Sequence, residues 1–123
     1  MAKKILIVDD EANIRELVRF AVEDEGYEIF EAGDGETGLK MAREIKPDLM
    51  TLDVMLPGKV GYQVCEELKA DPATRSIYII IMSARGKSRL ELTGKMQGAD
   101  EVMAKPFEPL ELAEKIRSAL KKK

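Results

Sequence analysis

The sequence contains no histidine, no tryptophan and one cysteine among its 123 residues, and aromatic residues make up only 5% of it. One cysteine cannot form a disulfide framework, and without histidine the chain cannot build a Cys/His zinc site, a Ser-His-Asp triad or a site with a histidine base. No apolar run approaches the roughly 20 residues of a membrane-spanning helix. Basic and acidic residues number 20 and 23, a net charge of −3, which argues against binding of nucleic acid by the whole surface. Any chemistry must therefore use carboxylates, hydroxyls and lysines.

The length of the chain supports one domain, and we expect it to cover residues 1–123. No linker or low-complexity segment divides the sequence. The apolar stretch after the N-terminus ends at Asp9, too soon for the core of a signal peptide. We therefore expect a cytoplasmic protein without a membrane-bound segment.

Short apolar runs alternate with amphipathic segments along the chain. The predicted strands are Ile5–Val8, Tyr27–Glu31, Leu49–Leu52, Ile77–Met82 and Glu101–Ala104. Apolar residues at helical spacing predict helices over 14–22, 39–45, 64–68, 86–97 and 112–120, of which the fourth has an interior Gly94 and is expected to be the most mobile. Because each crossover between strands is a helix, the pattern predicts an α/β fold with a parallel sheet that is covered on both faces. We expect Cys65, Phe20 and Phe107 in its core.

Residues able to bind a metal or a phosphate follow four of the five predicted strands. Asp9 and Asp10 follow the first strand, Asp53 the third, Ser83 the fourth and Lys105 the fifth. Ligands of such sheets bind beyond the carboxyl ends of the strands, so these side chains stand where a site is expected. Taken singly, each has an ordinary structural explanation, and a cap on the first helix is the obvious one for Asp10 or for Glu11. Together they favour a functional site.

The three aspartates would converge if the first and third strands are neighbours. Two carboxylates about 4 Å apart repel each other by about 4 kcal/mol at an effective dielectric constant near 20, so a proton or a cation must compensate. Mg²⁺ prefers one or two carboxylates together with water and phosphate oxygens. With Lys105 as a second positive charge and Ser83 as a hydrogen-bond donor, one aspartate could accept a phosphoryl group while the others bind the metal.

From Lys4 to Leu120 the sequence resembles the receiver domains of two-component response regulators. The resemblance is carried by Val8-Asp9-Asp10-Glu11, Asp53-Val54-Met55-Leu56-Pro57, Gly61, Ser83-Ala84-Arg85, Gly98-Ala99-Asp100 and Lys105-Pro106-Phe107. It implies a flavodoxin-like, doubly wound five-stranded sheet with strand order 2-1-3-4-5.

The resemblance also implies roles for individual residues. Asp53 corresponds to the phosphoacceptor and also to a metal ligand. Asp9 and Asp10 correspond to the other acids that bind Mg²⁺, and the backbone carbonyl of Met55 to a further metal ligand. Ser83 corresponds to the hydroxyl residue that contacts the phosphoryl group, and Lys105 to the lysine that pairs with it. The bond between Lys105 and the following proline is cis in the family.

The implied partner is a sensor histidine kinase or a histidine phosphotransfer protein, and the implied product is a changed surface around the fourth helix and fifth strand that regulates a downstream protein. The chain would be a phosphoacceptor that catalyses its own phosphoryl transfer and slow dephosphorylation, not an enzyme in the usual sense. We expect no direct contact of this chain with nucleic acid. Val102 stands where the family usually has an aromatic residue that turns inward on phosphorylation, which puts that half of the switch in question.

Family members often dimerise through a basic residue of the fourth helix and an acid of the fifth. Here the corresponding residues are Glu91 and Glu111, and like charges oppose that contact. A monomer and a phosphorylation-dependent dimer therefore both stay open.

Three alternative functions compete with the switch. A phosphatase with an aspartate nucleophile usually carries Asp-x-Asp on the first strand, whereas Asp9 and Asp10 are adjacent here. A flavin-binding electron carrier of similar topology would need a Ser/Thr-rich phosphate loop where this chain has acids. A receiver-like module that binds partners without phosphate is disfavoured by the complete set of acids, hydroxyl and lysine, but Val102 leaves it open for the output step.

Overall fold

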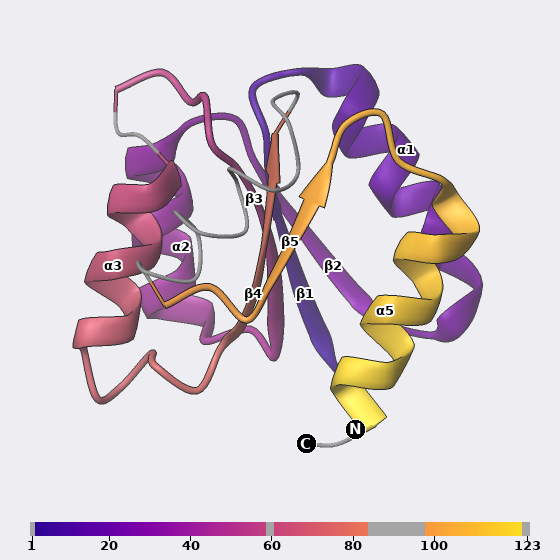
Figure 1. Ribbon diagram of the computed structural model, residues 1–123. Coiled ribbons are helices and arrows are strands. Elements are labelled where there is room, and N and C mark those ends of the chain that lie inside the picture. The colour runs from indigo at the N-terminus through magenta and orange to yellow at the C-terminus, as the bar shows by residue number, and fades with distance from the viewer. Residues whose placement is uncertain (1, 59–60, 84–97, 122–123) are drawn as a thin grey trace.

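The computed structural model describes residues 2–58, 61–83 and 98–121. Its strands are β1 (Lys4–Val8), β2 (Glu28–Ala32), β3 (Leu49–Asp53), β4 (Tyr78–Ser83) and β5 (Glu101–Ala104). All neighbours pair in parallel, in the order β2-β1-β3-β4-β5 (Figure 1). The α/β doubly wound sheet and its strand order, predicted from the pattern and the resemblance, are confirmed.

The described helices are α1 (Ala12–Val22), the short 3₁₀ helix η1 (Glu23–Glu25), α2 (Gly35–Ile45), α3 (Gly61–Ala70) and α5 (Pro109–Lys121). Helices α2 and α3 cover one face of the sheet, and α1 and α5 cover the other (Figure 1). The predicted fourth helix over 86–97, its expected mobility and Glu91 lie outside the described residues. Within those residues, none of the helices combines the length and the hydropathy that crossing a bilayer requires.

The core consists of two apolar layers on either side of the sheet. Successive side chains of a strand point to opposite faces. Leu6 and Val8 of β1 accordingly pack with the layer beneath α2 and α3, while Ile5 and Ile7 pack with the layer beneath α1 and α5. Each fully buried side chain of this size contributes roughly 1.5–3 kcal/mol. The continuous apolar strands of the sequence are thus explained by burial on both faces.

Three residues mark where helices start or end. Gly26 adopts the left-handed conformation with φ of 77° and closes η1 at the end of α1. Asp34 caps α2, because its carboxylate accepts a hydrogen bond from the backbone N–H of Thr37 at 2.7 Å. Pro109 begins α5, where its missing N–H costs nothing. These signals set where each helix starts relative to the strand ends.

One expected core residue lies on the surface. Phe20 is 65% exposed, so its assignment to the core was wrong. Helix α1 buries Val18 and Val22, which are four residues apart on one face, and Phe20 between them points away. Phe107 is partly buried against the α1/α5 layer. Cys65 is buried, and burial raises the pKa of its thiol to about 11, so it is a core residue.

Candidate functional site

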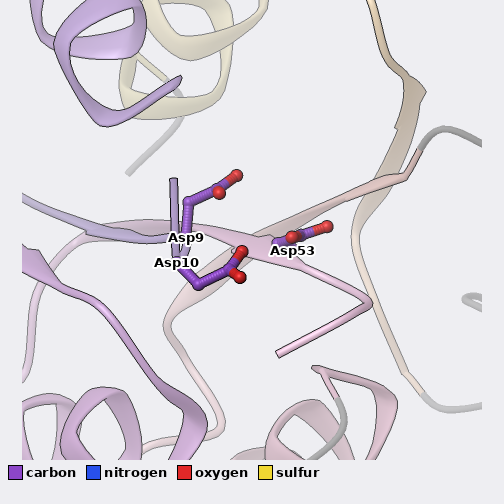
Figure 2. Close-up of side chains that lie close together, drawn as sticks. All are labelled: Asp9, Asp10 and Asp53. Carbon is purple, nitrogen blue, oxygen red and sulfur yellow. The ribbon is translucent and has the colours of Figure 1, made fainter. Parts of the chain in front are cut away.

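The carboxylates of Asp9, Asp10 and Asp53 meet at the carboxyl edge of the sheet. Val8 of β1 is paired with Leu52 of β3, so the next residues, Asp9 and Asp53, emerge side by side. One oxygen of each of the three carboxylates lies within 4.8 Å of the others. Figure 2 shows the three side chains close together. Asp9 and Asp53 are buried, whereas Asp10 is exposed. The predicted convergence of the three aspartates is confirmed.

Lys105 reaches this cluster from the end of β5. Its Nζ lies 2.6 Å from Oδ2 of Asp9 and 3.4 Å from Oδ1 of Asp53. The peptide bond between Lys105 and Pro106 is cis, as the resemblance implied. The lysine thus bridges the two buried aspartates, and the contact with Asp9 is the shorter one.

Burial and charge together shift the pKa values at this edge. Burial raises the pKa of the Asp53 carboxyl, the Lys105 ammonium opposes that rise, and the Asp9 carboxylate adds to it. For Lys105, burial alone would lower the pKa, but its hydrogen bond to Asp9 and the charges of Asp9 and Asp53 outweigh burial and raise it. Burial therefore destabilises the ionised form of the Asp53 carboxyl, whereas Lys105 keeps its positive charge.

Asp9 is fixed by backbone as well as by Lys105. Its Oδ1 accepts a hydrogen bond from the N–H of Glu11 at 2.9 Å, and its own N–H donates to the carbonyl of Ala32 at 3.1 Å. Glu11 occupies the cap position of α1, but its side chain makes no capping hydrogen bond. Neither Asp10 nor Glu11 therefore serves as the side-chain cap of α1, and this structural explanation for the acids is wrong.

Gly61 brings the start of α3 directly onto the carbonyl of Asp53. Its N–H donates to the carbonyl of Val54 at 2.9 Å. A Cβ atom at this position would stand 2.1 Å from the backbone oxygen of Asp53, a contact that no side chain could make. The glycine of the sequence motif is thus required by close packing beside the site.

The sequence model of the response regulator receiver domain family matches residues 5–117. The chain belongs to this family. The phosphate regulon transcriptional regulatory protein PhoB of Escherichia coli is 40% identical over 122 residues, which are 99% of this chain and 53% of PhoB. The DNA-binding response regulator MtrA of Mycobacterium leprae is 37% identical, with the same shares covered. The chain thus spans about half the length of the curated relatives it matches.

Solved structures show the same architecture. The chemotaxis response regulator CheY4 of Vibrio cholerae superimposes with a TM-score of 0.89 at 27% identity, covering 97% of this chain and 99% of CheY4. A CheY-like receiver domain protein of Methanospirillum hungatei JF-1 superimposes with a TM-score of 0.90 at 28% identity, covering 99% and 96%. The receiver fold predicted from the motifs is therefore shared along essentially the whole chain.

Two further predicted residues of this receiver domain, Ser83 and Met55, stand at the same edge. Ser83 is the last residue of β4 and is paired with Ala104 of β5, which places its backbone next to the start of the Lys105 segment. Met55 is exposed, and its backbone N–H donates to the Asp53 carboxylate. The roles of the Ser83 hydroxyl and the Met55 carbonyl stay predictions. Val102 is buried in the α2/α3 layer, so a small apolar side chain fills the aromatic position.

The donor set of the edge suits a hard divalent cation. Three carboxylates and one ammonium leave a formal charge of −2, which one Mg²⁺ would neutralise. Carboxylate oxygens are the protein ligands that Mg²⁺ prefers, and exposed Asp10 leaves room for the water molecules that it retains. The residues present therefore fit a magnesium ion.

Sequence reasoning missed one residue next to the site. The guanidinium of Arg15 donates from Nη1 to the backbone carbonyl of Asp9 at 2.7 Å and from Nε to Glu31 at 3.0 Å. An arginine one turn into the first helix and an acid at the end of the second strand were visible signals. Their pairing depends on β2 lying beside β1, which the local pattern alone does not reveal.

Proposed function

We propose that the chain is a phosphorylation-dependent signalling switch in which Asp53 accepts a phosphoryl group, with Mg²⁺, from a sensor histidine kinase or a histidine phosphotransfer protein. Membership of the receiver family supports phosphorylation-dependent signalling in two-component systems. The observation that carries the finer assignment is the meeting of Asp9, Asp10 and Asp53 with Lys105 at one edge of the sheet. The proposed receiver domain covers residues 1–123.

The proposed transfer needs a nucleophile and a means of neutralising phosphoryl oxygens. A carboxylate oxygen of Asp53 attacks phosphorus, the P–N bond to the donor histidine breaks, and the imidazole leaves with the electron pair and takes up a proton. When bound, Mg²⁺ supplies positive charge at the phosphoryl oxygens. Asp9, Asp10, Asp53 and the Met55 carbonyl would hold it. The Lys105 ammonium would pair with the phosphoryl group, and the Ser83 hydroxyl would donate to that group.

The switch output is proposed to change the surface around the fourth helix and β5, and so regulate a downstream protein. Buried Val102 on β5 has no ring to swing inward, so the response would run through Ser83 and the loop that follows it. The chain would work as a monomer or a phosphorylation-dependent dimer. The proposed chemistry makes it a phosphoacceptor that dephosphorylates slowly by itself.

Of the three alternative functions, the site argues most directly against the phosphatase. A phosphatase of the aspartate-nucleophile class would use an acid of the first strand, but Asp9 is engaged by Lys105 and by the N–H of Glu11. The proposed phosphoacceptor is Asp53 on β3, as the resemblance of the sequence implies. A colourless purified protein would dispose of the flavin carrier.

Labelling with acetyl phosphate tests the proposal. Mg²⁺-dependent addition of one phosphoryl group should be seen by intact-mass spectrometry in the wild type and lost in Asp53→Asn. Asp24→Asn, which changes an exposed aspartate in η1, is the matched control and should be labelled like the wild type. Phosphate that stays on the Asp53→Asn protein would contradict the assignment, as would labelling that persists in EDTA.

A further inference from the structure

We propose that Arg15 is a positioning residue of the metal site: held by Glu31, it fixes the peptide between Asp9 and Asp10 and thereby the place of the Asp10 carboxylate. The inference rests on the proposed function, because it concerns the ion that this edge would bind. It adds a residue that lies outside the motifs of the sequence.

Arg15 connects three segments of the chain through one guanidinium group. It stands on α1, its Nη1 donates to the carbonyl of Asp9 after β1, and its Nε donates to Glu31 on β2. Its side chain is only 22% exposed. The guanidinium also lies near Gly33, where a Cβ would be 3.6 Å from Nη1. A planar group with donors in a fixed fork can serve two acceptors at once, which a lysine ammonium does less specifically.

Asp10 depends on its backbone more than Asp9 does. The carboxylate of Asp9 is held by Lys105 and by the N–H of Glu11. The carboxylate of Asp10 is exposed, and no hydrogen bond or ion pair holds it within residues 2–58, 61–83 and 98–121. Because the peptide unit is planar, fixing the carbonyl oxygen of Asp9 also fixes the nitrogen and Cα of Asp10. Arg15 therefore holds the backbone of Asp10 in place, through its hydrogen bond to the carbonyl of Asp9.

Glu31 keeps Arg15 in place and partly balances its charge. The same carboxylate also binds Arg19, whose Nε and Nη2 lie 2.8 Å and 2.7 Å from Oε2. Arg19 is one turn further along α1, its side chain is 41% exposed, and it has no hydrogen bond to Asp9. Arg19 thus shares the helix, the charge and the acid with Arg15 but lacks the contact with the metal-binding segment, which makes it the matched control.

The first experiment titrates Mg²⁺ into the full chain without a phosphodonor and follows amide shifts by NMR. Arg15→Lys keeps the charge and should weaken Mg²⁺ binding roughly tenfold, the low end of what loss of a supporting contact costs a metal site. Arg19→Lys should weaken it less than about twofold, because exposed ion pairs contribute little. In the metal-free proteins, the carbonyl carbon of Asp9 and the amide nitrogen of Asp10 should shift in Arg15→Lys and not in Arg19→Lys.

Each outcome decides the matter. Unchanged Mg²⁺ affinity in Arg15→Lys, or equal losses in the two lysine variants, overturns the proposal. A wild type that shows no Mg²⁺-dependent shift refutes the proposed function, and the inference falls with it. That result differs from the case in which the wild type binds Mg²⁺ and Arg15→Lys binds it with the same affinity.

A second variant covers the case in which Arg15→Lys folds poorly. Glu31→Gln leaves the arginine in place and should itself weaken Mg²⁺ binding, by less than Arg15→Lys does. Where Arg15→Lys does fold, the double variant should bind Mg²⁺ like Arg15→Lys alone if Glu31 acts through Arg15. Additive losses in this cycle would show that Glu31 acts separately and would overturn the linked arrangement.

Discussion

Two lysines of similar burial stand at opposite edges of the sheet, and they do different things. Lys105 at the carboxyl edge is 11% exposed, and Lys69 at the amino edge is 18% exposed. Lys69 extends from α3 and binds Asp100 at 2.8 Å and the carbonyls of Arg75 and Ile77 at 3.1 Å and 2.6 Å. Each of the three N–H donors of its ammonium has an acceptor, so Lys69 has a structural role.

The difference between the edges is charge balance, not burial. At the amino edge one ammonium meets one carboxylate, and the same oxygen of Asp100 also accepts from the N–H of Ile79 at 2.9 Å. At the carboxyl edge one ammonium faces Asp9 and Asp53, with Asp10 beside them. An excess of carboxylates in a buried setting leaves a requirement for further positive charge. That requirement distinguishes the carboxyl edge, which has an excess of carboxylates, from the amino edge, where the charges balance.

The largest expected effect comes from breaking the amino edge. Lys69→Met should lower the free energy of unfolding by about 3 kcal/mol, because three hydrogen bonds donated by its ammonium, to Asp100 and to two carbonyls, are lost. Urea unfolding measures this loss. Mg²⁺ binding and acetyl phosphate labelling of the folded variant should stay near those of the wild type. Weakened Mg²⁺ binding would mean that the two edges are coupled.

The next effect compares the glycines of the two edges. Gly61→Ala should cost about 2 kcal/mol by overpacking and slow labelling on the order of tenfold, because the new Cβ pushes against the Asp53 backbone. Gly98 has a φ of +94° beside the flexible side chain of Lys69, so Gly98→Ala should cost about 1 kcal/mol and leave labelling unchanged. Equal labelling rates in Gly61→Ala and Gly98→Ala would contradict this difference between the two edges.

A smaller effect is expected from Lys105→Met. In EDTA the variant should lose about 1–2 kcal/mol of unfolding free energy, since Asp9 and Asp53 then face each other without a cation. Saturating Mg²⁺ should restore most of this loss, whereas it should restore none of the loss in Lys69→Met. Denaturation of both variants with and without the ion makes the comparison, and equal rescue would contradict it.

The smallest effect is a pH dependence of stability in metal-free protein. Because the pKa of Asp53 is raised on folding, its contribution favours the fold at a pH below the unfolded value of 3.8 and is lost as the pH rises through the folded value. Because asparagine does not ionise, Asp53→Asn does not lose this contribution to stability as the pH rises. The variant should therefore gain stability over the wild type as the pH rises from about 4, with a plateau once Asp53 is ionised. A difference that shrinks over this range would contradict the sign.

Most of the fold could be predicted because both kinds of element leave strong local patterns. The buried strands β1, β3 and β4 are continuous apolar runs. Their bounds differ from the predicted ones by one residue, at the start of β1, at the end of β3 and at both ends of β4. Phe20 was misplaced because residue type was followed instead of its position on the helix. Its neighbours at the spacing that faces the sheet are buried, and Phe20 is not among them.

The candidate site could be predicted only as far as residues at strand ends allow. The meeting of Asp9, Asp10 and Asp53 follows once the first and third strands are neighbours. That Lys105 approaches Asp9 more closely than Asp53 depends on side-chain paths across the sheet, which no sequence spacing records. The contact of Arg15 with the backbone of Asp9 is hidden for the same reason.

The ammonium that spans two acids has a consequence for the protein at rest. In the metal-free protein, the ammonium of Lys105 reduces the repulsion between the carboxylates of Asp9 and Asp53. A magnesium ion bound as proposed would share Asp9 with Lys105, so the lysine would weaken metal binding. Formation of an acyl phosphate at Asp53 would remove one of the two carboxylates that Lys105 contacts and leave its side chain able to follow the phosphoryl group.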